Sequence, residues 1–167
     1  HADAAASPRY LSGWLPYWTT QTSTTSFLAN SKAFKDISPF WHDLNAVAKT
    51  TSNPSGITIA NNSLSYSTRG TVLAQLKATK VPVYPSITDS TGKNYLAQVL
   101  KTSKARQDIE NKIVSLVMLN QYDGIDLDFE TFAFSDTYSS WATTRSAWVS
   151  FVKELAAPVE NVGAKYK

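Results

Sequence analysis

The chain has 167 residues, of which 43% are hydrophobic, 17% charged and 12% aromatic, a composition typical of one globular domain and not of a disordered segment. The net charge is +3, but the basic residues are scattered, so no stripe of lysine and arginine indicates a nucleic-acid partner. No apolar run approaches the ~18 residues of a membrane span, so no membrane partner is expected. The absence of cysteine excludes disulfides, thiolate zinc sites and a cysteine nucleophile, and the sequence predicts neither a metal nor a cofactor.

Four apolar segments predict strands, and helices are predicted between them. The strands are expected at residues 10–15, 36–41, 81–87 and 124–129, and the helices at 27–34, 69–80, 103–120 and 141–157. Residues 21–26 predict a loop rich in serine and threonine, 53–67 a small hairpin, and Pro158 a kink or the end of the last helix. Two prolines predict a third strand that is irregular or tapered at its ends. The alternation of strands and helices predicts an α/β fold, with four βα units and a parallel sheet.

The first residues predict an exported protein. Residues 1–8 are small and alanine-rich, do not begin with methionine, and resemble the region just after a removed signal peptide. We expect these residues to form a flexible mature N-terminus and the protein to be secreted. A boundary chosen for expression would look the same.

The most informative segment is the predicted strand at 124–129 together with the residue that follows it. Because side chains alternate faces, Asp126, Asp128 and Glu130 share one face, about 6.6 Å apart in succession. Burial and mutual repulsion oppose ionisation of such a row, so at least one member is expected to be protonated near neutral pH. Glu130 reaches furthest toward solvent and is suited to protonating a leaving-group oxygen. A solvated edge strand or a site for a hard cation are the alternatives, and the alternation with apolar residues disfavours them.

This segment carries a resemblance to a known family. Residues 123–130 read DGIDLDFE and resemble the DGxDxDxE signature of glycoside hydrolase family 18, the chitinase family. Residues 12–18 are similar to the family's first strand, and residues 37–41 to the second strand of its bacterial spore-cortex and germination-type subgroup. Ser86 matches the serine of the family's SxGG motif, although Thr88 and Asp89 replace the two glycines.

The resemblance implies a TIM-type (β/α)8 barrel with its site at the C-terminal ends of the strands. It also implies retaining hydrolysis of polysaccharides that contain β-linked N-acetylglucosamine, assisted by the acetamido group of the substrate. In that scheme Glu130 is the acid/base, Asp128 orients the acetamido group, and Asp126 shares a proton with Asp128. Asp123 is expected to serve structure. Aromatic side chains at the predicted strand ends are candidates for sugar stacking or for packing. The candidate substrate-binding residues are Trp14, Tyr17, Trp18, Phe40, Trp41 and Ser86.

The barrel needs eight βα units, typically in ~250 residues, and this sequence predicts four. Residues 1–167 are therefore expected to be the N-terminal half of a catalytic barrel, as a fragment, a proteolysed product or one part of an assembly. The two outer strands would keep open edges, so the remaining barrel half is an expected partner, as a second chain or a missing segment. The substrate could be chitin, peptidoglycan or an N-glycan core.

Two other functions stay open. A non-catalytic carbohydrate-binding protein or inhibitor of the family-18 type usually lacks the last glutamate of the signature, which Glu130 supplies here. His1 and His42 could together hold copper, as in the polysaccharide monooxygenases, although those proteins are β-sandwiches. Otherwise His42 is expected in a loop or at the barrel rim.

Overall fold

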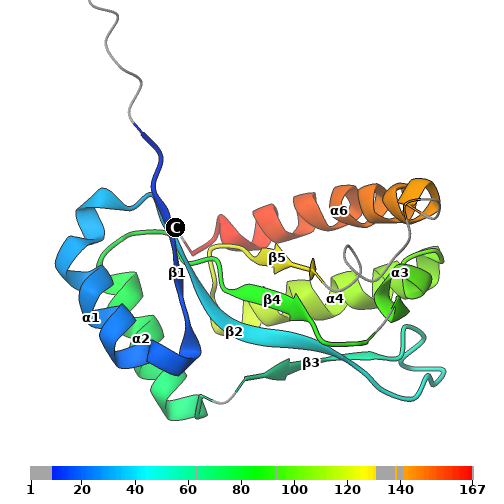
Figure 1. Cartoon of the computed structure of the whole chain (residues 1–167), viewed down its shortest axis with the longest axis horizontal. Helices are drawn as coiled ribbons and strands as arrows, with labels where there is room; N and C mark the ends of the chain where they lie inside the picture. Colours follow the sequence, from blue (N-terminus) through cyan, green and yellow to red (C-terminus); the bar gives the residue numbers. More distant parts are fainter. Residues whose placement is uncertain (1–8, 63, 93, 131–137, 139–140, 167) are drawn as a thin grey trace, which may run out of the picture.

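A parallel sheet forms the centre of the molecule. The computed structural model describes residues 9–62, 64–92, 94–130, 138 and 141–166, so the expected flexible terminus at 1–8 lies outside the described residues. The sheet order is β1 (Ser12–Leu15), β2 (Asp36–Ala46), β4 (Ser86–Asp89) and β5 (Asp126–Asp128), and all neighbours in this order are parallel. Strand β3 (Ile57–Asn61) pairs antiparallel with the second half of β2 (Figure 1). The hairpin predicted within residues 53–67 is therefore wrong in its bounds, because the partner strand is β2 and this segment supplies only one of the two strands.

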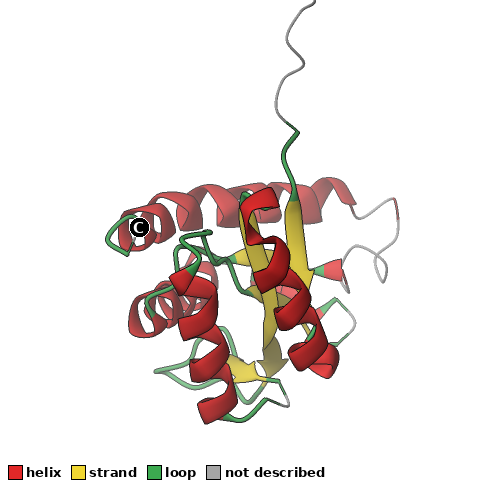
Figure 2. Cartoon of the chain, turned by 90° about the vertical axis from the view of Figure 1, so that its left-hand side faces the viewer, coloured by secondary structure: helices red, strands yellow, loops and turns green. Residues whose placement is uncertain are grey.

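Helices follow the strands and lie around the sheet (Figure 2). They are α1 (Thr20–Asn30), α2 (Tyr66–Ala78), α3 (Tyr95–Val99), α4 (Ser103–Asn120) and α6 (Trp141–Gly163), with short 3-10 turns at Tyr17–Thr19 and Ser31–Ala33. The order of elements confirms the predicted α/β class, a curled half-barrel of parallel strands that alternate with helices. No helix in the described part of the chain is long and apolar enough to cross a membrane.

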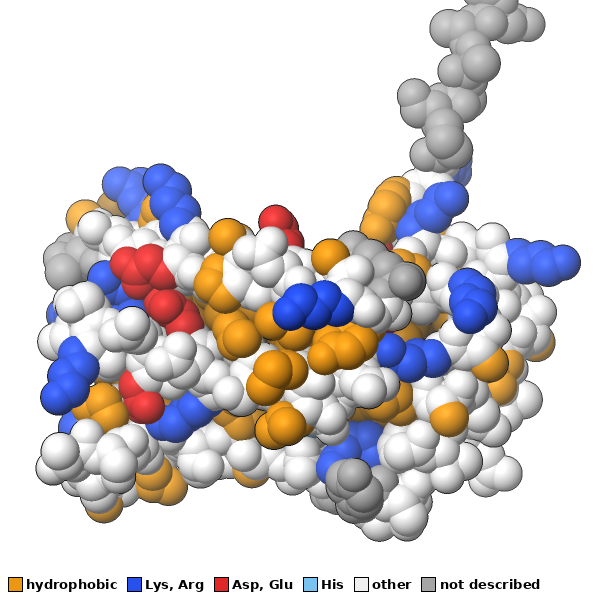
Figure 3. Space-filling view, turned by 180° about the vertical axis from the view of Figure 1, so that it is seen from behind, with side chains coloured by type: hydrophobic (Ala, Val, Ile, Leu, Met, Phe, Trp, Pro, Cys, Tyr) orange, Lys and Arg blue, Asp and Glu red, His pale blue; other side chains and the backbone are white. Residues whose placement is uncertain are grey.

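The core lies between the sheet and the helices. Leu44 of β2 and Ile87 of β4 are fully buried, as are Ile109, Ile113 and Val117 on one face of α4. This is the apolar face that the helical spacing predicts, and full burial of each such side chain contributes about 1.5–3 kcal/mol. The rear view shows further apolar side chains gathered near its centre, with acidic side chains to one side (Figure 3).

Helix α1 corrects the prediction of a loop at residues 21–26. Its serine and threonine hydroxyls donate to carbonyl oxygens one turn earlier, from Ser23 to Thr19 at 2.8 Å and from Thr25 to Gln21 at 2.8 Å. The hydroxyls are thus satisfied inside the helix and do not compete with it. The buried side chain of Phe27 attaches the helix to the core, so packing outweighs the weak helix propensity of this segment.

The structure decides between the alternatives that prolines left open at two places. Strand β4 begins at Ser86, directly after Pro85, so the two prolines of residues 81–87 precede the strand and leave its ladder intact. Helix α6 continues through Pro158 to Gly163. A proline inside a helix costs about 3 kcal/mol, and the burial of Leu155 and Val159 on either side offsets this cost.

A charged contact joins α4 to α6. Arg106 donates to both carboxylate oxygens of Glu154, at 2.7 Å and 2.9 Å. Glu110 lies one turn further along α4, and burial, followed by its hydrogen bond and the charge of Glu154, raises the pKa of Glu110 to about 7. The two carboxyl groups therefore share a proton at the junction of the helices below neutral pH.

This junction predicts a pH-dependent stability. The folded pKa of Glu110 is raised above its ordinary 4.5, so its stabilising contribution is complete below pH 4.5 and is lost as the pH rises through about 7. Because the group is partly exposed and solvent screens it, we expect a loss of about 1 kcal/mol. Glu110→Gln should flatten this dependence in urea unfolding at pH 5 and pH 8, whereas Glu160→Gln, at an exposed position, should leave it unchanged.

Candidate active site

The register between β4 and β5 decides which way the acidic row faces. Ser86 pairs with Asp126 and Thr88 with Asp128, and Ser86 Oγ donates to Asp126 Oδ2 at 2.7 Å. These side chains share one face of the sheet, which we call the lumen face. Ile87, between the two polar residues of β4, is fully buried on the opposite face. The shared face of Asp126 and Asp128 agrees with the alternation read from the sequence, although the strand is shorter than the predicted 124–129.

Asp126 is held from two strands at once. The indole Nε1 of Trp14 donates to Asp126 Oδ2 at 3.2 Å, and the same oxygen accepts the hydrogen bond from Ser86. Trp14 belongs to β1 and Asp126 to β5, the two outer strands of the described sheet. The indole therefore reaches across the lumen face and ties one side of the half-barrel to the other.

Asp128, at the centre of the row, has a raised pKa. Burial raises the pKa of Asp128, and the charges of Glu130 and Asp126, together with a hydrogen bond to Glu130, raise it further. The side chain is half-buried and has a carboxyl group on each side along the row. A proton is thus bound more tightly at the centre of the row than on an ordinary aspartate, while exposed Glu130 follows β5 at the tip.

Asp123 has a structural partner below the row. The backbone amide of Val83 donates to Asp123 Oδ2 at 2.8 Å. This bond fixes the entry of the chain into β5 against the segment before β4, and it supports the structural role expected for this residue.

Four of the predicted aromatic residues form one cluster beside the row. Phe40 lies edge-on to both Trp14 and Trp18, with ring centroids 6.4 Å and 6.1 Å apart, and Tyr17 contacts Trp18 at 5.0 Å. Trp14 is 62% exposed and Trp18 65% exposed. We call Trp14, Tyr17, Trp18 and Phe40 the aromatic cluster. Large exposed rings beside hydrogen-bonding carboxyl groups are what the stacking and orientation of a sugar require.

Trp41 and His42 are placed differently from the expectation. A β-bulge between Phe40 and His42 shifts the register of β2 against β4. The side chains of Trp41 and His42 are each only 1% exposed. Trp41 packs against Tyr122, and His42 Nε2 lies 3.1 Å from the hydroxyl of the same tyrosine. Trp41 therefore cannot stack on a sugar, and His42 is a core residue and not a rim residue.

The same burial bears on the copper hypothesis. Burial, aided by the charge of Arg69, lowers the pKa of His42 to about 4. His1 lies outside the described residues. Among the residues that the structure describes, no group of three or more histidine, aspartate or glutamate side chains is arranged to hold a metal ion. The chain also alternates strands and helices, unlike a β-sandwich.

Sequence reasoning missed one polar residue of the lumen face. Asp43 of β2 accepts a hydrogen bond from the hydroxyl of Thr88, which pairs with Asp128. Strict alternation from Phe40 would place residue 43 on the outer face, and the extra residue in the bulge returns it to the lumen. The run of three bulky residues at 40–42, which breaks the alternation of polar and apolar side chains, is the one signal that could have indicated the bulge.

The solved structures that match this chain include chitinases and a spore cortex-lytic enzyme, whereas no family model and no curated protein sequence matches it. The C-terminal domain of a protein assigned as a chitinase from Desulfitobacterium hafniense has a TM-score of 0.68 and 18% identity, over 94% of this chain and 44% of its own. The family GH18 chitinase of Cycas revoluta, solved with allosamidin, has a TM-score of 0.61 and 19% identity, over 90% of this chain and 40% of its own. The spore cortex-lytic enzyme SleL of Bacillus cereus has a TM-score of 0.61 and 11% identity, over 92% of this chain and 33% of its own. The chain thus has the fold of a chitinase barrel in part, and it spans less than half the length of these neighbours.

The electrostatics of the row give a direct test. Removing the charge of Glu130 by Glu130→Gln should lower the pKa of Asp128, because that charge and its hydrogen bond both raise it. The midpoint can be followed by carbon NMR of the aspartate carboxyl groups across a pH titration. Glu160→Gln removes an equal charge from α6 and should leave the midpoint of Asp128 in place. An unchanged midpoint in Glu130→Gln would contradict the coupling.

Proposed function

We propose that this chain, which has the fold of part of a chitinase barrel, carries the acid/base apparatus of a glycoside hydrolase. The proposed substrate is a polysaccharide that contains β-linked N-acetylglucosamine, cleaved with retention and with assistance from its own acetamido group. The observation that supports this most strongly is the acidic row on the lumen face, in which the pKa of Asp128 is raised, with the aromatic cluster beside it. A carboxyl group poised next to others is the arrangement that general acid catalysis needs.

In the proposed reaction Glu130 protonates the glycosidic oxygen as the bond to the sugar's anomeric carbon breaks. The carbonyl oxygen of the acetamido group attacks the same carbon and forms a cyclic oxazolinium ion. Glu130, now a carboxylate, then takes a proton from the water that opens the ring. The acid is regenerated and the product keeps the original anomeric configuration. Exposed Glu130 at the tip of the row is accessible to both the leaving group and the water.

Asp128 acts on the acetamido group in this proposal. Burial and the neighbouring carboxyl groups raise its pKa, and Asp126 beside it is the group with which it can exchange a proton. When the proton passes to Asp126, the carboxylate of Asp128 can accept the N–H of the acetamido group and stabilise the developing positive charge. The bonds from Trp14 and Ser86 hold Asp126 in place for this exchange.

Substitutions in the row test the proposal in any form of the protein in which the barrel is closed. Glu130→Gln should abolish hydrolysis of an N-acetylglucosamine oligosaccharide, with a fall in kcat of about 10²-fold or more, and leave binding intact. Asp128→Asn should reduce kcat far more than it raises the dissociation constant, because its role lies in the transition state. Turnover and isothermal titration calorimetry on the same oligosaccharide measure both quantities.

Three outcomes separate the possible functions. Near-parental turnover in Glu130→Gln would refute the acid assignment. Equal losses of turnover and affinity in Asp128→Asn would indicate that this residue only binds the sugar. Binding without hydrolysis in the parental protein would favour a non-catalytic carbohydrate-binding protein, for which the aromatic cluster alone would suffice.

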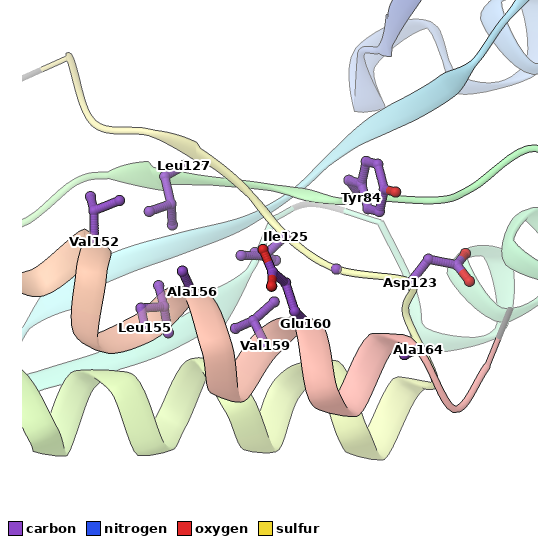
Figure 4. A pocket seen from close by; sticks show the side chains of 11 residues that line it. Tyr84, Asp123, Ile125, Leu127, Val152, Leu155, Ala156, Val159, Glu160 and Ala164 are labelled. Atoms are coloured by element: carbon purple, nitrogen blue, oxygen red, sulfur yellow. The ribbon is translucent and has the colours of Figure 1, made fainter.

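The proposal also includes a partner for the free edge of β5. A groove of about 550 Å³ runs along this edge, where Ile125 and Leu127 point toward the apolar residues of α6, among them Val152 (Figure 4). Strand β5 pairs with β4 on one edge, and its other edge has no partner strand among the described residues. Such an edge next to an apolar groove is a site for another strand. We propose that a further strand–helix unit of a complete barrel covers this edge and its groove. A second polypeptide or an additional segment of the same polypeptide would supply that unit.

Lysine substitutions on α6 test this use of the groove. We expect copies of the 167-residue chain to associate with one another, or the chain to be stabilised by a polypeptide that supplies the other half of the barrel. Otherwise its apolar groove is exposed to water. Val152→Lys places a charge in the groove and should reduce association in light scattering. Val149→Lys lies outside the groove on the same helix, with a similar exposure of 41% against 37%, and should not. A compact and active monomer would contradict the expectation.

A further inference from the structure

Helix α6 is built in two parts that are attached to the rest of the chain differently. Pro158 has no backbone N–H, so the carbonyl oxygen of Glu154, one turn earlier, lacks its helical donor. Beyond this proline the helix is fixed closely to the sheet, because a side chain at Gly163 would overlap the carbonyl of Asp123. The interrupted ladder therefore separates the first part, residues 141–157, from an anchored end.

The first part of α6 is held to the end of β5 by aromatic rings. The ring centroid of Phe129 lies 5.7 Å from that of Trp148 and 6.4 Å from that of Phe151. Phe151 is fully buried, and Phe129 directly precedes the candidate acid Glu130. Val152 of the same part lines the groove beside β5. A movement of this part would thus change both the groove and the packing next to Glu130.

A carboxyl pair joins the first part of α6 to α4. Both carboxylate oxygens of Glu154 accept from the guanidinium of Arg106, at 2.7 Å and 2.9 Å. Glu110 hydrogen-bonds to Glu154, and its Oε1 is buried without a hydrogen-bond partner among the described residues. A buried carboxylate oxygen without a donor is costly, and a second negative charge beside Glu154 adds repulsion. The geometry therefore suits a neutral Glu110 that donates its proton to Glu154.

The surroundings supply no second cation for this pair. The charged groups that act on Glu110 are Glu154 of α6 and Arg106 of its own helix. Strand β3 packs against α4 and helix α3 against α6, and neither carries an acidic or basic residue. The phenol of Tyr95 in α3 donates to the carbonyl oxygen of Ser55 instead. Loss of the proton would thus leave two carboxylates against one guanidinium.

We propose that residues 141–157 form a flap, which the proton shared by Glu110 and Glu154 holds against α4 and which turns about Pro158 when that proton is released to solvent. Burial and the neighbouring Glu154 raise the pKa of Glu110 to about 7. The flap is therefore attached below this pH and loosens as the pH rises through it. Its loosening reshapes the groove beside β5 and frees Phe129, whether or not the acidic row cleaves a glycan.

Native-state hydrogen exchange of the 167-residue chain measures how often the flap opens. After correction for intrinsic exchange rates, we expect the protection of the flap amides to fall about fivefold from pH 6 to pH 8. Low urea should change it little, because a local opening exposes little surface. Glu110→Gln keeps a neutral donor beside Glu154 and should abolish the fall. Glu160→Gln removes a charge beyond Pro158 and should keep it.

Pro158→Ala tests the pivot. It supplies an N–H for the carbonyl oxygen of Glu154, and both parts of α6 should then exchange with the same protection. The inference is overturned if the flap amides exchange only together with those of α4, or if their protection does not depend on pH. It is also overturned if the fall persists in Glu110→Gln or if the flap still opens alone in Pro158→Ala. Because exchange and not turnover is measured, failure of the proposed hydrolysis would leave these outcomes unchanged.

Discussion

The pairing of Ser86 with Asp126 is the constraint on which the rest of the site depends. A slip of one residue between β4 and β5 would turn Asp126 and Asp128 toward the helices and Leu127 toward the lumen. The native register is enforced from both sides, because Ile87 must be buried and because Ser86 donates to Asp126. Packing and hydrogen bonding therefore select the same alignment, and the Trp14 indole adds a third contact from the far strand.

The distribution of charge is as informative as the register. The chain has a net charge of +3, yet the lumen face carries Asp43, Asp126 and Asp128, and the described ion pairs lie on helices. Carboxyl groups that face one another without a cation raise one another's affinity for protons, as burial and its neighbours do at Asp128. A similar effect joins Glu110 to Glu154 between α4 and α6, where it concerns stability and not chemistry.

The sequence predicts the parts of this structure that follow from periodicity and from a specific motif. The alternation of strands and helices, the limits of α4 at 103–120 and the shared face of Asp126 and Asp128 all appear in it. The sequence did not predict helix α1, because segments rich in serine and threonine are typical of loops. Their hydroxyls can nevertheless donate to backbone carbonyl oxygens within a helix, as Ser23 does. The burial of Trp41 and His42 depends on a bulge, which is a property of two paired strands and not of one. Secretion and the other barrel half stay predictions.

That bulge makes β2 a strand with two phases. Up to Phe40 the even-numbered residues face the lumen, and from Asp43 onward the odd-numbered ones do. Deletion of Trp41 alone would restore a regular ladder and change the numbering of every later residue, yet Asp43 would keep its partner Thr88. An insertion between His42 and Asp43 would instead move Asp43 out of its place opposite Thr88. The register of the lumen face thus survives the loss of the bulge residue, at the cost of the packing of Trp41 on Tyr122, and it does not survive an extra residue directly before Asp43.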